Sequence, residues 1–119
     1  MKKRLLNPCR VRRINGGFSF IPHRFLTEGF YACMSNEERN LYMFLVLASD
    51  KNGLSYYSDK SICTYTGLPH EAYIHARKGL VEKDLIEFNG TLFQVLELPH
   101  NPPGTRLLSG LAQQIGKRI

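Results

Sequence analysis

The chain has 119 residues, of which 43% are hydrophobic and 22% charged, and its formal net charge is +6. This composition is typical of one folded globular domain with short extensions, and it argues against a disordered chain. The first residues lack the apolar stretch of a secretory signal, and the longest apolar run, residues 41–48, is too short to span a membrane. We therefore expect a cytoplasmic protein without membrane contact.

The basic charge is concentrated at the two ends of the chain. Residues 1–13 contain six Lys or Arg and no acid, which accounts for the whole excess. Residues 34–98 carry six bases against nine acids, whereas residues 99–119 carry three bases and no acid. A basic end of this kind is either a solvated tail or an arm that contacts nucleic acid.

Composition also divides the chain into three parts. Residues 1–16 show no helical or alternating pattern and are predicted to form a basic flexible arm. A folded domain is expected over residues 17–98, with its core at 35–98 and an apolar N-terminal extension. Residues 99–119 are predicted to be a Pro/Gly linker followed by a short C-terminal helix or tail.

The apolar extension carries a dense set of aromatic and aliphatic residues, so we expect it to cover part of the domain. Its sequence favours a short strand over residues 17–21. A helix should then begin near Pro22 or His23, because proline suits the first helical position.

The first helix of the core is predicted at about residues 36–49. Ser35 and Glu38 match the capping box, in which a hydroxyl and a carboxylate bind free amide donors. Apolar residues then recur at helical spacing. The residues that end this helix are Asp50, Asn52 and Gly53.

Two further helices follow a short strand predicted over residues 54–57. Ser58 and Asp59 can cap a helix that runs to Thr66, and Gly67 ends it. Pro69 can open the next helix, whose stop is Asp84, a short polar residue that tolerates positive φ. The inward stripe of this helix is predicted to be Tyr73, Ala76 and Leu80, with Val81 as a further candidate.

Two alternating strands end the core. The segments LIEF and TLFQVLEL flank Asn89-Gly90, a pair that favours a two-residue hairpin turn. The predicted order is therefore helix, short strand, helix, turn, helix and hairpin. This order indicates an α+β fold.

The second and third helices resemble those of the winged-helix superfamily of bacterial and phage regulators and replication proteins. The segment that carries the resemblance is SDKSICTYTGLPHEAYIHARKGLVEKDLI. In that superfamily the third helix ends in Leu, three polar residues, Gly, Leu and Ile. Leu80, Leu85 and Ile86 match this pattern, and Asp84 replaces the glycine. The resemblance covers about residues 35–98 and implies a winged helix with a three-helix core and a C-terminal β-hairpin wing.

The resemblance implies a protein that binds double-stranded DNA, namely a transcriptional regulator or a replication or mobile-element factor, dimeric and associated with the nucleoid. In such proteins the third helix enters the major groove and the wing lies toward the minor groove or the phosphates. By position, the contacts of the domain would be Lys60, His70, Ile74, His75, Arg77, Lys78 and Asn89. Arg77 and Lys78 suit phosphate or guanine.

The arm would add contacts that the acidic middle section lacks. Arg10, Arg12 and Arg13 can lie along the DNA backbone or in the minor groove. Glu71, on the third helix, opposes DNA binding unless it accepts from a cytosine amino group. Other acids lie at the C-terminal end of that helix, away from the part that usually contacts bases.

A second interpretation is a winged-helix protein-protein interaction module that does not bind DNA, whose sign would be an exposed apolar patch. A relic of a mobile element without function is a third. Catalysis has no support, because the sequence lacks a nucleophile elbow and a phosphate-binding glycine loop. The three cysteines are expected to be reduced, and the His and Cys spacing does not suit zinc. We expect no enzyme activity, metal, cofactor or small-molecule ligand.

Overall fold

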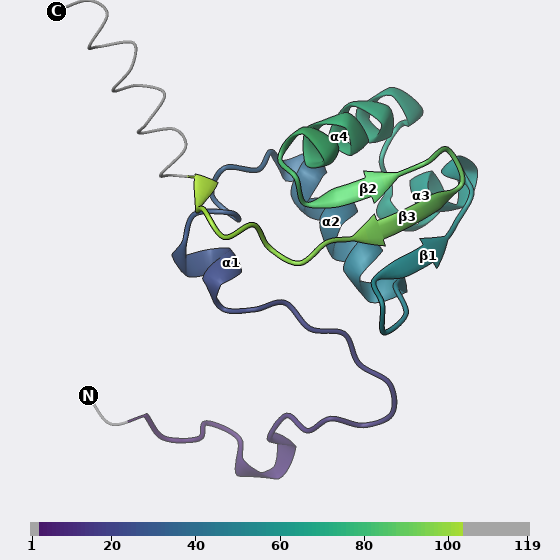
Figure 1. The fold of residues 1–119 in the computed structure, drawn as a ribbon. Coiled ribbons are helices and arrows are strands. Elements are labelled where there is room, and N and C mark those ends of the chain that lie inside the picture. The colour runs from purple at the N-terminus through teal and green to yellow at the C-terminus, as the bar shows by residue number, and fades with distance from the viewer. Residues whose placement is uncertain (1–2, 104–119) are drawn as a thin grey trace, which may run out of the picture.

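The computed structural model describes residues 3–103 of the chain (Figure 1). A short 3-10 helix, η1, precedes four α-helices and three strands in the described part. Their bounds are η1 Pro8–Arg10, α1 Arg24–Thr27, α2 Asn36–Ala48, β1 Leu54–Tyr56, α3 Asp59–Thr66, α4 His70–Glu82, β2 Ile86–Phe88 and β3 Leu92–Val95. The C-terminal helix or tail predicted beyond residue 103 lies outside the described residues.

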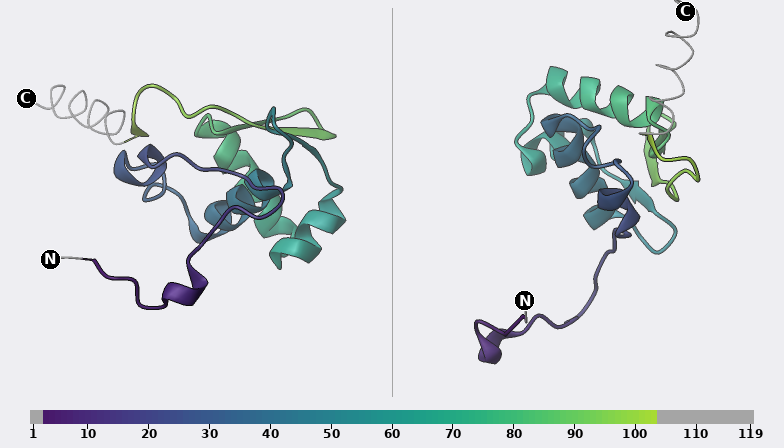
Figure 2. Two further views of the ribbon diagram at one scale, coloured as in Figure 1. Left: turned by 90° about the horizontal axis from the view of Figure 1, so that it is seen from below. Right: turned by 90° about the vertical axis from the view of Figure 1, so that its left-hand side faces the viewer.

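The fold is α+β, as predicted from the order of the elements. The three strands form one antiparallel sheet in the order β1-β3-β2, with α2, α3 and α4 on one side of it (Figure 2). Ser55 of β1 and Phe88 of β2 both pair with Phe93 of β3, which is fully buried. The core therefore lies between the sheet and the three helices, where burial of apolar side chains stabilises both layers.

Helix α2 begins at the predicted capping box. The Glu38 amide donates to Ser35 Oγ at 3.1 Å, and the Ser35 amide donates to Glu38 Oε1 at 2.8 Å. After α2, Asp50 accepts hydrogen bonds from the Asn52 and Leu54 amides and leads the chain into β1. These bonds satisfy amide donors that a helix or turn otherwise leaves free.

The predicted ends of α3 and α4 are confirmed. Ser58 caps α3, and Gly67 ends it with a φ of 74°. Asp84 follows α4 with a φ of 62°, in the left-handed region that short polar residues tolerate. The predicted inward stripe of α4 is buried as well. Val81 was wrongly placed in that stripe, because it is 43% exposed on the outer side of the helix.

The hairpin forms, but its turn differs from the predicted Asn89-Gly90 turn. The Asn89 amide donates to the Leu92 carbonyl at 3.2 Å, so Gly90 and Thr91 occupy the centre of the turn. Gly90 has a φ of 101°, whereas Asn89 does not have positive φ. The Asn89 side chain instead accepts from the Thr91 and Leu92 amides, a use of asparagine that competes with the expected turn.

The strand predicted over residues 17–21 is absent, because this segment joins neither edge of the sheet. Residues 3–20 are exposed throughout; the first part of this segment extends away from the helices (Figure 1), whereas Phe18 and Phe20 line a hollow beside the end of α2. The helix expected next is the single turn α1. Phe25 of α1 stacks on Tyr42 of α2, with ring centroids 5.0 Å apart, so this part of the extension does cover the domain.

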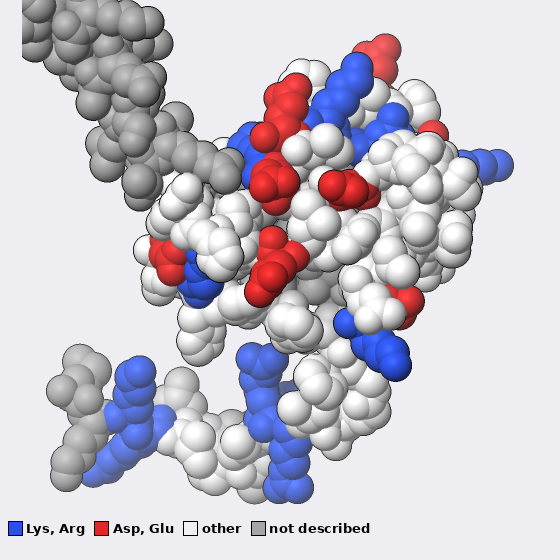
Figure 3. All heavy atoms as spheres, viewed as in Figure 1, with Lys and Arg blue, Asp and Glu red and all other residues white. Residues whose placement is uncertain are grey.

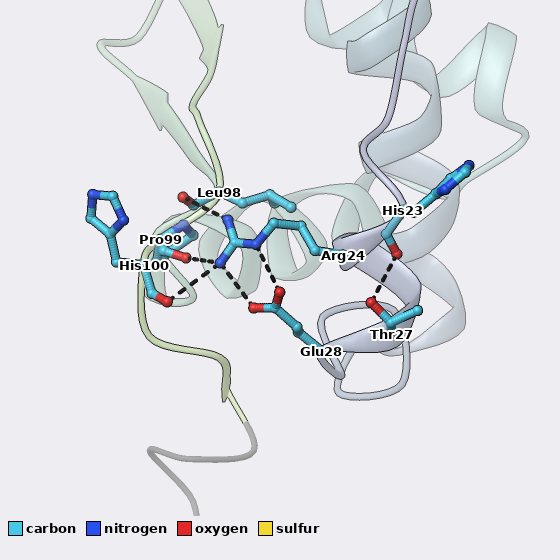
Figure 4. Close-up of polar contacts among 7 residues, drawn as sticks. All are labelled: His23, Arg24, Thr27, Glu28, Leu98, Pro99 and His100. Atoms are coloured by element: carbon cyan, nitrogen blue, oxygen red, sulfur yellow. Dashed lines mark hydrogen bonds and ion pairs between the residues drawn. The ribbon is translucent and has the colours of Figure 1, made fainter.

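Arg24 ties α1 to the segment that follows the sheet (Figure 4). Its guanidinium donates to the carbonyls of Leu98, Pro99 and His100, at 3.3, 2.6 and 3.4 Å. On its other side it forms a two-point contact with the Glu28 carboxylate, at 3.0 and 3.1 Å. A planar guanidinium has enough donors to hold both groups at once.

Helix α4 approaches α2 at Gly79, where a side chain has no space. A Cβ atom added to Gly79 would overlap the Glu38 carboxylate. Gly79→Ala is therefore expected to lower the free energy of unfolding by about 1–3 kcal/mol, although alanine favours helix. Chemical denaturation would measure this change.

Gly17→Ala is the matched control, because Gly17 has open space around it and no positive φ. It should change the free energy of unfolding by less than about 0.5 kcal/mol. Equal effects of the two substitutions would contradict the close α2–α4 contact.

Candidate nucleic-acid interface

Helix α4 presents an outer face to solvent along its whole length. Its inner face, Tyr73, Ala76 and Leu80, is buried in the core. The exposed side chains of the outer face are His70, Glu71, His75, Lys78, Val81 and Glu82. The buried and the exposed side chains of α4 both recur with the helical repeat. The position of the buried stripe therefore determines which residues point to solvent and can contact a partner.

Arg77, predicted to contact DNA, is held within the domain. Its Nη1 donates to the Tyr73 hydroxyl at 3.1 Å and lies 3.6 Å from Asp59 Oδ1. Its guanidinium also lies over the Phe88 ring, 4.3 Å from the centroid. With only 18% of its side chain exposed, Arg77 joins α4 to α3 and β2.

Tyr73 completes this connection. Its hydroxyl donates to Asp59 Oδ1 at 2.7 Å. Burial, together with the hydrogen bond to Asp59, raises the pKa of Tyr73 to about 12. The phenol therefore stays protonated and can donate to Asp59 over the neutral pH range. Sequence reasoning missed both contacts of Tyr73: the i, i+4 spacing was a usable signal for its contact with Arg77, whereas nothing in the sequence indicated Asp59 as its partner.

The other predicted contacts of the domain lie in different surroundings. Lys60 and His70 line the same shallow hollow between α3 and α4. His75 and Lys78 are exposed on the outer face of α4. Ile74 is only partly exposed, because it packs against the core. At the turn of the hairpin, Asn89 is exposed, but its side-chain oxygen already accepts two amide hydrogen bonds.

The arginines of the arm are not close to these residues. Arg10, Arg12 and Arg13 are exposed, and their side chains make no hydrogen bond or ion pair within residues 3–103. The arm lies at one side of the molecule and α4 at the other (Figures 1 and 2). The structure thus brings Lys60 and His70 together, whereas the basic arm lies apart from them.

The charge distribution of the surface follows the same division. The arm shows Lys and Arg without acids, whereas both signs alternate over α4 and β2 (Figure 3). On the outer face of α4, Lys78 lies between Glu71 and Glu82 in sequence. The long-range attraction for an anion is therefore strongest at the arm.

The described residues offer little to a metal ion. No group of three or more His, Cys, Asp or Glu among residues 3–103 is arranged to bind one. Cys9, Cys33 and Cys63 are free thiols. In the same part of the chain, no helix has the length and apolar character needed to cross a bilayer. A hollow of about 530 Å3 lies away from α4, between the N-terminal segment and the end of α2.

Arg77→Ala is expected to lower the free energy of unfolding by about 1–3 kcal/mol, because it removes a hydrogen bond, an ion pair and a ring contact. Lys78→Ala is the matched control on the same helix and should stay within about 0.5 kcal/mol of the parent. Thermal and urea unfolding would measure both. A stability loss confined to Lys78→Ala would contradict this assignment of Arg77.

Comparison of the chain with protein-family models, curated proteins and solved structures found no match. The function of the site is therefore inferred from its geometry and chemistry.

Proposed function

We propose that this protein is a winged-helix DNA-binding protein, in which α4 lies in the major groove and the basic arm contacts the phosphate backbone. The observation that carries the proposal is the order α2, β1, α3, α4, β2, β3, with β3 between the other two strands. This arrangement leaves the outer face of α4 free for a partner. The same order of elements is expected of the superfamily that the sequence resembles.

The proposed roles of the residues differ from those predicted by position. His75 and Lys78 contact bases or phosphates, because both are exposed on α4. Lys60 and His70 contact the backbone beside the first turn of α4. Arg77 orients α4 from within the domain and does not contact DNA.

Attraction to DNA comes mainly from the arm. The arm carries positive charge without acids, and no described part of the domain neutralises it. Neutralising phosphates releases counterions, so this attraction depends on salt but not on sequence. In this proposal the arm therefore supplies most of the affinity for DNA, and α4 supplies the preference for a sequence. These roles suit a homodimeric transcriptional regulator, or a homodimeric replication or mobile-element factor.

The α4 contact can be tested with the His75→Ala, Lys78→Ala double variant. Its Kd for a duplex selected from a random pool is expected to rise at least about tenfold. Fluorescence anisotropy would measure the Kd. Lys51→Ala, in the turn after α2, removes one exposed positive charge away from α4 and should leave the Kd within about twofold. Unchanged binding by the double variant would contradict the role of α4.

The arm contact can be tested by replacing Arg10, Arg12 and Arg13 together with alanine. The slope of log K against log salt should become shallower by about 0.9 for each phosphate that the arm no longer neutralises. The preference between the selected duplex and a scrambled one should stay unchanged, because the arm does not read bases. A full salt slope in the triple variant would remove the arm from the interface.

The protein-protein interaction module is the second candidate. Glu71 and Glu82 on the outer face of α4 favour it, since DNA repels both. The two candidate functions predict different results when the parent protein is titrated with duplex DNA. Absence of saturable binding to any duplex, even at low salt, would favour the protein partner.

A further inference from the structure

The hollow of about 530 Å3 beside the end of α2, which we name the α2 hollow, is built by four segments. They are residues 18–22 before α1, the C-terminal half of α2, the turn at residues 49–53, and residues 95–98 at the end of β3 and after it. Its apolar lining includes Phe18, Phe20, Tyr42, Val46, Val95 and Leu98. This volume and this apolar, aromatic lining are typical of small-molecule sites.

The walls of the α2 hollow are fixed to one another at two places. Arg24, just after the first segment, donates to the Leu98 carbonyl at 3.3 Å and to the Pro99 carbonyl at 2.6 Å (Figure 4). Elsewhere on the hollow, the Val95 amide donates to the Gly53 carbonyl at 2.8 Å. A Cβ atom added to Gly53 would overlap the Val95 carbonyl, so these two walls are in close contact. The hollow is therefore part of the packed domain.

Tyr42 of α2 places an unpaired hydroxyl in the α2 hollow. The residue is only 4% exposed, and Phe25 stacks on its ring. Its hydroxyl makes no hydrogen bond within residues 3–103, and burial alone raises its pKa to about 12. Among the unpaired polar side-chain atoms of the described buried residues, only Ser55 Oγ is fully enclosed, so the Tyr42 oxygen has an open side. Because Tyr42 lines the hollow, this hydroxyl opens into it and can donate to a ligand.

The rest of the lining determines the class of ligand. Phe18 and Phe20 are 69% and 76% exposed, so a ligand in the hollow would bury aromatic surface that the domain leaves in solvent. The charged side chains of the lining, Asp50, Lys51 and Glu97, are all exposed. A charged group among the buried part of the lining would lose its water without gaining a partner. The α2 hollow therefore favours an uncharged ligand.

We infer that the α2 hollow binds an uncharged aromatic molecule, whose ring contacts Phe18 and Phe20 and whose acceptor atom accepts a hydrogen bond from the Tyr42 hydroxyl. No local pattern of the sequence indicates this site, because residues as far apart as Phe18 and Leu98 build it. The site needs neither DNA nor a second copy of the chain, so its test is independent of the proposed function.

The experiment is an NMR titration of the full, isotope-labelled chain without DNA. The probes are acetophenone, an aromatic ketone, and alpha-methylstyrene, in which a CH2 group replaces the ketone oxygen. Acetophenone should shift the amide signals of residues that line the hollow, such as Ser49 and Val95, and leave those of α4 unchanged. Its Kd is expected to be on the order of 1 mM, because so small a ligand makes few contacts. Absence of these shifts up to the solubility limit of acetophenone would overturn the inference.

Tyr42→Phe tests the hydroxyl. It keeps the ring that stacks on Phe25, and the hydroxyl has no hydrogen bond to lose, so the midpoint of thermal unfolding should stay unchanged. The Kd of acetophenone should rise about fivefold, whereas that of alpha-methylstyrene should stay within about twofold, because only the ketone accepts from Tyr42. Tyr65→Phe, on an exposed tyrosine outside the hollow, is the matched control and should change neither Kd. Equal changes for the two probes in Tyr42→Phe would contradict the inference.

Phe20→Ala tests the aromatic wall. Phe20 is largely exposed, so the variant should fold, which circular dichroism would check. The Kd of both probes should rise at least about threefold, because the ring contact is lost. Leu47→Ala is the matched control, since Leu47 is 65% exposed and does not line the hollow, and both Kd values should equal those of the parent. Unchanged binding by Phe20→Ala, or an equal loss in Leu47→Ala, would overturn the inference as well.

Discussion

The arrangement of the domain depends on one buried carboxylate, Glu38. It accepts from the Ser35 amide at the start of α2, and it binds Lys83 Nζ, just after α4, at 2.9 and 3.1 Å. It also occupies the space that a side chain at Gly79 would need. A buried carboxylate is costly unless it is paired, so the cap of α2, the close approach of α4 and the ion pair must form together. Through them, α2 fixes the position of α4.

The second connection to α4 limits which of its residues can reach a partner. The contacts among Asp59, Tyr73 and Arg77 hold α4 against α3, on the side opposite its link to α2. Held from both sides, α4 keeps its outer face exposed with little net charge. In the proposed function, electrostatic attraction to DNA therefore comes from the arm. The proposed DNA-binding function thus separates affinity, on the arm, from selectivity, on a firmly held helix.

Helix α2 differs between its two sides. Its inner side packs against the core and α4, while Met43 and Leu47 on its outer side are exposed. The apolar run of α2 is too short to cross a membrane. Phe44 on the outer side contacts Tyr57 and Tyr65, so the domain itself covers part of this outer half.

Features that depend on neighbouring residues were predictable from the sequence. They include the capping box at Ser35, the cap at Ser58 and the left-handed stop at Asp84, because each involves a bond or a φ angle within a few residues. The tertiary structure alone decided the contacts between distant residues: Arg77 with Asp59, Arg24 with the carbonyls of residues 98–100, and the separation of the arm from α4. Such contacts exist only once helices and strands have packed, so no local pattern encodes them.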